Sequence, residues 1–257
     1  MTALAPEKAA IMAKTATLYR MVLDDHICPW GLKARHVLRS HGYAIDEHFL
    51  TSREAVDAFK AAHGVKTTPQ VWIDGERIGS HDDLLRFLGK PVRDPAALTY
   101  APVIAIFAMA ASMAVAANWA VSGTIASVRA IEWFVAFAMC LLALQKLRDV
   151  DSFATQFLGY DLLAQRWVPY ARLYPWLEGL AGVLMIGGAL HWFSIPVALF
   201  IGSIGAVSVF YAVYIQKRDL KCACVGGNSN VPLGFVSLTE NLMMIGMAVW
   251  MLMRQPM

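Results

Sequence analysis

The fold of the N-terminal third is decided by one stretch, Asp24-Asp25-His26-Ile27-Cys28-Pro29-Trp30-Gly31. This stretch follows a β-like segment at 17–23 and precedes a helical pattern at 30–40, with proline in the first helical turn. The positive end of a helix dipole stabilises a thiolate, which is both the nucleophile and the leaving group in disulfide chemistry. The stretch therefore predicts a reactive cysteine, Cys28, between a strand and a helix.

Outward from this stretch, strands and helices alternate along residues 15–88. Further β-like segments cover 45–50, 71–73 and 77–78, and further helical segments cover 53–63 and 81–88. A turn at Asp74-Gly75 joins the last two strands into a hairpin. The order βαβαββα predicts a compact α/β domain at residues 15–92, with a mixed sheet flanked by helices. Residues 1–14 form a lead-in, and the Pro-containing residues 93–100 are expected to be a linker.

The composition of the whole chain requires a second domain of a different kind. Hydrophobic residues make up 58% of the 257 residues and charged residues only 16%, which is too apolar for one soluble globule of this length. The first hundred residues hold most of the charges and six of the seven histidines. The net charge of +3 is small, and basic residues stand at the ends of apolar runs. This pattern indicates a membrane protein and argues against a nucleic-acid partner.

Five apolar segments after residue 100 are each long enough to cross a bilayer. They cover residues 101–121, 128–147, 171–191, 193–215 and 233–253. We therefore expect residues 101–257 to form an all-α, multi-spanning helix bundle in the lipid bilayer.

The basic residues predict how these spans are oriented, because positively charged loops stay in the cytosol. Arg129 and Arg254 flank one end of the spans. Nine basic residues flank the other end: Lys90, Arg93, Lys146, Arg148, Arg166, Arg172, Lys217, Arg218 and Lys221. Lys8, Lys14 and Arg20 interrupt the N-terminus before an apolar signal sequence forms. We expect a bacterial inner-membrane protein, with the N-terminal domain and the loop of Cys222 and Cys224 in the cytosol and the C-terminus outside.

The chain has four cysteines, Cys28, Cys140, Cys222 and Cys224. In a chain that faces the cytosol, they favour redox or metal chemistry over a structural disulfide framework. A disulfide between Cys222 and Cys224 would close a small, strained ring and be easily reduced. The same two thiolates also suit a soft ion such as Cu(I) or Hg(II). Cys140, apolar on both sides within a span, is expected to be a packing residue.

Three glutamates lie within or beside the apolar spans, where a carboxylate is costly and normally faces the bundle interior. Glu178 and Glu240, the latter beside Asn241, are candidates for a polar site that holds a proton or a cation. Glu132 lies nearer to a span end, within reach of water. A structural hydrogen-bonding role is the alternative for all three.

Three motifs resemble the glutaredoxin family over residues 15–90. They are Cys28-Pro29-Trp30-Gly31, Thr67-Thr68-Pro69-Gln70-Val71-Trp72-Ile73-Asp74-Gly75 and Ile78-Gly79-Ser80-His81-Asp82-Asp83-Leu84. The resemblance implies a thioredoxin-like fold, with glutathione as co-substrate and Cys28 as the nucleophile. It also assigns the remaining glutathione contacts: Trp30 at the helix start, Thr68 and the family's cis-proline Pro69 at the cysteine moiety, and Ser80, His81 and Asp82 at the γ-glutamyl end.

Two positions depart from the glutaredoxin pattern. Gly31 replaces the second, resolving cysteine, and Asp25 replaces a lysine that is frequent three residues before the nucleophile. The chain therefore resembles the monothiol forms. Their mixed disulfide with glutathione is resolved by a second glutathione or by another cysteine.

Residues 130–255 resemble the MauE/DoxX-like family of small membrane proteins. The resembling segments are 144–149, 153–163, 174–178, 221–227 and 232–241. The resemblance implies an association with disulfide formation and with quinone-related chemistry. The span at 101–121 is additional to that pattern.

Together these features predict a membrane-tethered, glutathione-dependent thiol–disulfide oxidoreductase that relays electrons between glutathione at Cys28 and the Cys222/Cys224 pair. Its further substrate is a thiol or disulfide protein or small molecule; a quinone, a soft metal and a homodimer are open alternatives. One rival function is soft-metal handling or transport, in which Cys28 passes a glutathione-bound metal to Cys222 and Cys224. Another is a membrane anchor whose domain binds an iron–sulfur cluster together with glutathione.

Overall fold

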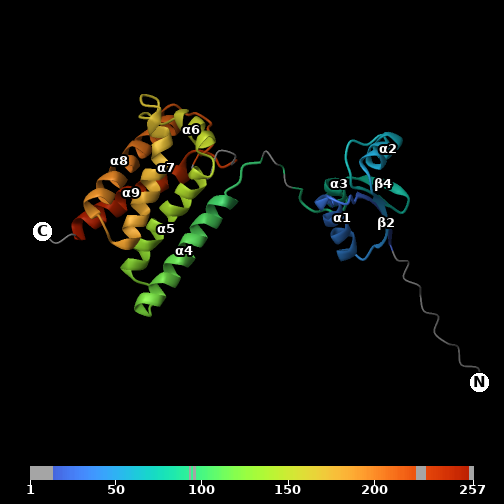
Figure 1. The fold of residues 1–257 in the computed structure, drawn as a ribbon, viewed down its shortest axis with the longest axis horizontal. Helices are drawn as coiled ribbons and strands as arrows, with labels where there is room; N and C mark the ends of the chain where they lie inside the picture. Colours follow the sequence, from blue (N-terminus) through green and yellow to red (C-terminus); the bar gives the residue numbers. More distant parts are fainter. Residues whose placement is uncertain (1–13, 93, 95–96, 224–229, 255–257) are drawn as a thin grey trace, which may run out of the picture. The chain divides into compact units, whose positions relative to one another are not determined.

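The computed structural model describes residues 14–92, 94, 97–223 and 230–254. The chain divides into two compact units, residues 1–95 and residues 96–257 (Figure 1). Each unit has its own hydrophobic core, so each is described by itself.

The first unit is a mixed α/β domain, and the expected fold class is confirmed. Its sheet has the strand order β2-β1-β3-β4, with β1 parallel to β2 and antiparallel to β3. The elements in chain order are β1 (Thr15–Met21), α1 (Pro29–Ser40), β2 (Ala44–Leu50), α2 (Arg53–His63), β3 (Gln70–Ile73), β4 (Glu76–Gly79) and α3 (His81–Phe87). Asp74 and Gly75, with φ of 50° and 83°, form the tight turn of the β3–β4 hairpin.

Alternation along β1 places helices on both faces of the sheet. Leu18 is fully buried in a cluster with Leu38 of α1 and Leu84 of α3. Its neighbour Tyr19 points to the other face, where its ring centroid lies 4.8 Å from that of Phe59 in α2. The domain therefore has three layers, with α1 and α3 on one side and α2 on the other.

The second unit is a helix bundle. Its elements are α4 (Ala101–Ser122), α5 (Val128–Leu147), α6 (Val150–Leu158), α7 (Pro169–Gly187), α8 (His191–Phe210), continued by the π-helical turn η1 (Tyr211–Ile215), and α9 (Phe235–Arg254). Within the described residues, four helices are long and apolar enough to cross a membrane: α4, α5, α8 with its η1 extension, and α9. These helices confirm that the chain is a membrane protein.

The remaining expected span, residues 171–191, corresponds to α7, which is not among those four helices. The helix is 19 residues long and contains Arg172, Pro175 and Glu178. It packs against α5 and α8, and Glu178 is fully buried in the bundle. The Glu178 carboxylate is thus solvated by other helices, and the total of five spans stays a prediction.

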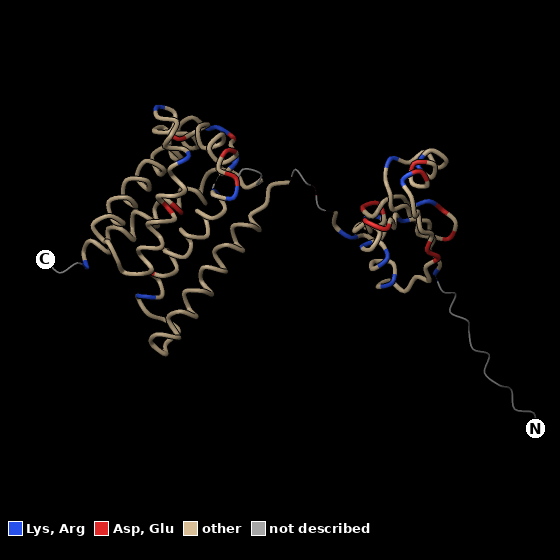
Figure 2. Tube along the Cα trace, viewed as in Figure 1, with Lys and Arg blue, Asp and Glu red and all other residues tan. Residues whose placement is uncertain are grey.

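Contacts between loops define one end of the bundle. The backbone N–H of Thr99 donates to the carbonyl of Asn230 at 3.2 Å, and Arg218 donates to the carbonyl of Gly159 at 2.9 Å. The segments before α4, after α6 and between α8 and α9 therefore meet at this end. Most basic residues of the unit lie here (Figure 2), whereas Arg129 and Arg254 lie at the opposite end of α5 and α9.

One basic residue assigned to a loop from the sequence lies elsewhere. Lys146 belongs to the last turn of α5 and is only 2% exposed, because its ammonium group pairs with two buried carboxylates. Its charge is neutralised inside the bundle, so it does not contribute to orientation. Eight basic residues, the nine counted above less Lys146, still favour the predicted topology over the two at the other end.

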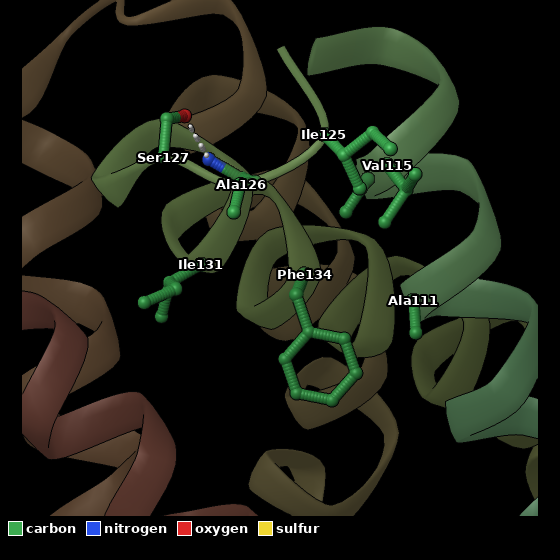
Figure 3. Close-up of a pocket in the computed structure, with 9 residues that line it drawn as sticks. Ala111, Val115, Ile125, Ala126, Ser127, Ile131 and Phe134 are labelled. Carbon is green, nitrogen blue, oxygen red and sulfur yellow. Dashed lines mark hydrogen bonds between the residues drawn. The ribbon is translucent and has the colours of Figure 1, made fainter. Parts of the chain in front are cut away.

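An apolar hollow of about 610 Å³ lies between α4 and α5. Figure 3 shows Val115 of α4 and Phe134 of α5 on its walls, and Ser127 is the polar residue of its lining. Such a surface suits a lipid chain rather than catalysis. The chemistry must therefore be sought elsewhere in the bundle.

The predicted orientation can be tested with two introduced cysteines at exposed loop positions. Ala126→Cys lies between α4 and α5, and Gln216→Cys follows η1. We expect a membrane-impermeant maleimide to label position 126 in intact cells and to label position 216 only after permeabilisation, as read by peptide mapping. Labelling of position 216 in intact cells would contradict the predicted cytosolic location of this loop.

Candidate functional site

Cys28 is the N-cap residue of α1 and a free thiol. Its backbone N–H donates to the carbonyl of Met21 at 3.2 Å, and its own carbonyl accepts from Leu32 at 3.3 Å. Pro29 occupies the first helical turn, as expected. The cysteine is 5% exposed. It is thus held rigidly between the end of β1 and the positive end of the α1 dipole.

The sheet brings the three glutaredoxin-like motifs to one edge. Tyr19 near the end of β1 pairs with Gln70 at the start of β3, directly after Pro69. Val71 pairs in turn with Gly79 at the end of β4, directly before Ser80. The Thr68–Pro69 peptide bond is cis, as the resemblance implies. Cys28, Pro69 and Ser80 therefore lie at adjacent strand ends.

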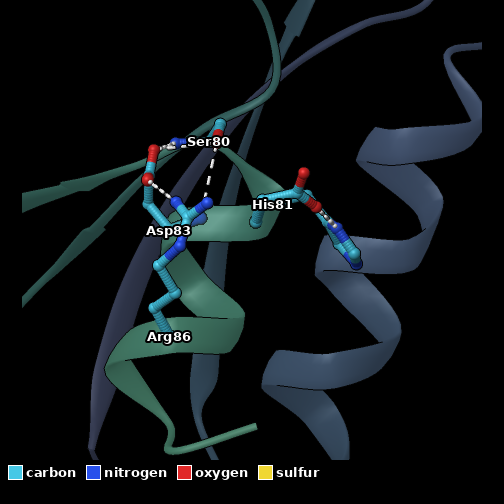
Figure 4. A network of polar contacts seen from close by, with 5 residues as sticks. Ser80, His81, Asp83 and Arg86 are labelled. Atoms are coloured by element: carbon cyan, nitrogen blue, oxygen red, sulfur yellow. Dashed lines mark hydrogen bonds and ion pairs between the residues drawn. The ribbon is translucent and has the colours of Figure 1, made fainter. Parts of the chain in front are cut away.

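The segment at the start of α3 is a complete capping box (Figure 4). The backbone N–H and the hydroxyl of Ser80 donate to the Asp83 carboxylate at 2.9 and 2.8 Å, and Arg86 donates to it at 2.7 Å. The hydrogen bond from the Ser80 backbone has the larger effect and that from its hydroxyl the smaller one, and both lower the pKa of Asp83 below its ordinary value. The backbone N–H of Ser80 already donates to Asp83. The backbone N–H groups of His81 and Asp82 are therefore the ones to test as contacts of the γ-glutamyl end of glutathione.

One aromatic contact joins the start of α1 to the start of α3, and a cation–π contact lies within α1. The Trp30 ring, half exposed, lies 5.4 Å from the ring of His81. In the second contact, the Lys33 ammonium lies 4.3 Å from the centre of the Trp30 ring. Lys33 was not identified from the sequence, although its i, i+3 spacing from Trp30 could have indicated it. It supplies a positive charge in α1, the helix that begins at the Cys28 N-cap.

The position of the missing second cysteine is filled by a neighbour. A Cβ atom added to Gly31 would lie 2.7 Å from the Cβ of Arg20. Arg20 is 6% exposed; it donates to Glu47 at 3.0 Å and its guanidinium lies 4.7 Å from the centre of the Phe49 ring. Because Arg20 is fixed by these contacts, a cysteine at position 31 would require the strand or helix to move.

In the membrane unit, the structure brings Glu178 and Glu240 together through Lys146. The ammonium donates to the two Glu178 oxygens at 2.8 and 2.6 Å and to Glu240 at 2.7 Å, and all three residues are at most 5% exposed. Lys146 was missed as a site residue because it ends an apolar run and resembles a loop charge. Two carboxylates within apolar spans need a cation, and that requirement could have identified it.

The other membrane residues lie around this triad or away from it. Asn241 donates to the carbonyl of Ser237 at 2.7 Å, while Glu132 pairs with Arg254 at 2.6 Å at the opposite bundle end. Cys140 packs on α7, with its sulfur 3.9 Å from the carbonyl of Gly179.

Cys222 is fully buried and disulfide-bonded, and its sulfur lies 3.0 Å from the Ser237 hydroxyl. A disulfide sulfur carries no hydrogen, so the Ser237 hydroxyl is the donor in this contact. Cys224, the other predicted redox cysteine of this loop, lies outside the described residues.

Comparisons with known proteins match each unit to a different family. Residues 16–78 match the family model of glutaredoxin, and residues 124–254 match that of methylamine utilisation protein MauE. Hybrid peroxiredoxin hyPrx5 of Haemophilus influenzae is 35% identical over 60 residues, which are 23% of this chain and 25% of that protein. Methylamine utilization protein MauE of Methylophilus methylotrophus is 26% identical over 119 residues, which are 46% of this chain and 63% of that protein. The chain thus spans less than two thirds of either relative.

The contact between Gly31 and Arg20 predicts that a side chain at position 31 destabilises the domain. We expect Gly31→Ala to lower the free energy of unfolding by about 1–3 kcal/mol, because the added methyl group overpacks a fixed neighbour. Urea unfolding of fragment 14–92, followed by tryptophan fluorescence, measures it. In a double-mutant cycle with Arg20→Gly, which removes the Cβ atom in question, the two effects should be non-additive; full additivity would contradict the contact.

The capping box predicts a pH dependence of stability. Because the folded-state pKa of Asp83 is lowered, its ionised form stabilises the domain above the unfolded-state pKa of about 4, and this contribution is lost as pH falls through the folded-state value. We expect Asp83→Asn to be less stable than wild type at pH 7 and the difference to shrink as the pH falls below about 4, in urea titrations of the same fragment. Asp57→Asn, at an exposed position, is the control; a difference that persists at low pH would contradict the assignment.

Proposed function

Because the chain belongs to the MauE family, with a glutaredoxin domain joined ahead of it, we propose that it is a membrane-bound, glutathione-dependent thiol–disulfide oxidoreductase. It is a membrane protein with a thiol redox domain. The observation that carries the finer proposal is the free Cys28 thiol at a helix N-terminus, beside Pro69 and the α3 start. This arrangement suits the formation of a mixed disulfide with glutathione.

The site chemistry fits glutathione at three points. The helix dipole of α1 stabilises the Cys28 thiolate that attacks a disulfide sulfur. Trp30 and the Lys33 ammonium offer an apolar face and a positive charge to an anionic tripeptide. The amides at the start of α3 offer hydrogen-bond donors to a carboxylate. These contacts support the assignment of Trp30, Thr68, Pro69, His81 and Asp82 to the glutathione site.

We further propose that Cys28 exchanges electrons with the Cys222/Cys224 pair. Gly31 leaves Cys28 without a neighbouring resolving thiol, and Arg20 occupies the space that one would need. Residues 88–100, between α3 and α4, reach at most about 45 Å when extended. Such a tether raises the effective concentration of one thiol at the other toward the millimolar range, if both occupy the same side of the membrane.

The exchange balances with glutathione as the reductant. The Cys28 thiolate attacks the Cys222/Cys224 disulfide and releases one cysteine as a thiolate. A first glutathione thiolate attacks Cys28 in the resulting mixed disulfide, forming Cys28–glutathione and releasing the second cysteine. A second glutathione then forms oxidised glutathione and restores Cys28. Two glutathione thiols are oxidised for each disulfide reduced, and the reverse sequence oxidises the pair.

A trapping experiment on the full chain in detergent tests this function. We expect oxidised glutathione to form an adduct on Cys28 that is absent in Cys28→Ser and retained in Cys140→Ser, as read by mass spectrometry. In Cys222→Ser, oxidising conditions should give a Cys28–Cys224 disulfide. Cys224→Ser should give less of the corresponding Cys28–Cys222 product, because Cys222 is fully buried.

The outcomes separate the alternatives. Absence of the Cys28 adduct would reject glutathione dependence. A normal adduct without any Cys28-linked peptide in either variant would reject the relay and leave metal handling or cluster binding to be tested. Differently tagged chains, mixed before oxidation, distinguish a disulfide within one chain from one between two copies.

A further inference from the structure

Polar side chains that line one cavity lie between the buried sulfur of Cys222 and the Lys146 triad. Ser237, which donates to this sulfur, lies one helical turn before Glu240 and Asn241 on α9. Ser237, Glu240, Asn241 and Lys146 also line one small cavity in the bundle. The cavity measures about 10 Å³, close to the least space that holds one water molecule.

The lining of this cavity is suited to hold a water molecule. The Asn241 side-chain oxygen is buried and makes no hydrogen bond within the described part of the chain. A buried amide oxygen normally has a partner, and a bridging water would supply one. The same water would lie among Ser237, Glu240 and Lys146.

When the disulfide of Cys222 is reduced, the buried Cys222 thiolate needs a proton. An incoming thiolate cannot reach a sulfur that is 0% exposed, so it must attack the sulfur bonded to Cys222, and Cys222 leaves as a thiolate. An unpaired anion in this low-dielectric interior is costly. Protonation of the leaving sulfur removes that cost.

The triad is suited to hold such a proton. It has one ammonium group and two carboxylates, and a fully ionised triad would bury a net negative charge unless one further proton joins it. The titratable groups that face it come from every neighbouring segment. They are Lys146 of α5, Tyr160 and Asp161 after α6, Tyr170, Tyr174 and Glu178 of α7, and Glu240 of α9.

We propose that the Lys146–Glu178–Glu240 triad is the proton donor for the Cys222 thiolate, acting through the cavity water and the Ser237 hydroxyl. When the S–S bond breaks, Ser237 gives its hydrogen to the Cys222 sulfur and receives one from the water, which the triad reprotonates. The triad then carries one more negative charge until a proton returns from solvent. This inference rests on the proposed thiol–disulfide function, since it assigns the proton step of that same reaction.

The test measures how fast dithiothreitol reduces the Cys222 disulfide in the purified full chain, as a function of pH, by alkylation and mass spectrometry. We expect Glu240→Gln to slow the reaction by about 100-fold near neutral pH. Its pH profile should then follow only the ionisation of dithiothreitol. Glu132→Gln, which removes a carboxylate at the opposite bundle end, is the matched control and should keep the wild-type rate and profile.

Two further variants separate proton donation from a purely structural role. Ser237→Ala should slow reduction without changing the charge of the triad. The neutral triple variant Lys146→Met/Glu178→Gln/Glu240→Gln leaves no unpaired charge and should fold even where Glu240→Gln does not. We expect it to be slow as well; a folded triple variant with the wild-type rate and pH profile would overturn the proposal.

The measurement is independent of the N-terminal domain. Dithiothreitol reduces Cys222 without Cys28, so the triad can be assessed in Cys28→Ser. If Cys28 forms no glutathione adduct but Glu240→Gln still slows reduction, the proposed function fails and the proton donor stands. If Cys28 reacts normally and Glu240→Gln matches wild type, the proton donor fails alone.

Discussion

The membrane bundle depends on the pairing of the Lys146 ammonium group with two buried carboxylates. This group joins α5 to Glu178 of α7 and Glu240 of α9 at 2.6–2.8 Å, in the bundle interior, where lipid cannot solvate a charge. Loss of the Lys146 ammonium would leave two buried carboxylates without a cation, at a cost of about 3–5 kcal/mol. The pairing therefore fixes the register of three helices, and that register sets where Ser237 and Cys222 lie.

Small residues let the helices approach closely enough for this pairing. A Cβ atom at Gly182 of α7 would lie 2.8 Å from the Cys140 sulfur, and one at Gly205 of α8 would collide with the Asn241 amide. Cys140 thus has a packing environment rather than a polar one, which agrees with its position in an apolar run. Close backbone approach at glycine is a common means of helix association in lipid, where the hydrophobic effect does not drive helices together.

In the N-terminal domain, strand pairing in the sheet positions the site residues. Strand pairing places Cys28, Pro69 and Ser80 at neighbouring strand ends, although they are separated by about fifty residues of sequence. Arg20, held by Glu47 and Phe49, fills the space beside Gly31. The monothiol character of the site is therefore part of the packing and not only of the sequence.

The sequence by itself determined the two-domain organisation, the α/β fold and the two family resemblances, because hydropathy, periodicity and short motifs are local properties. It identified Cys28 from its position before a helix, and Glu178 and Glu240 from the cost of carboxylates in apolar runs. It did not reveal that Lys146 pairs with them, that Lys33 contacts Trp30, that Arg20 blocks position 31 or that Ser237 contacts Cys222. These contacts, apart from that of Lys33 with Trp30, join residues far apart in the chain, and they depend on helix and strand register. Only the tertiary structure decides that register, because it results from packing all the elements at once.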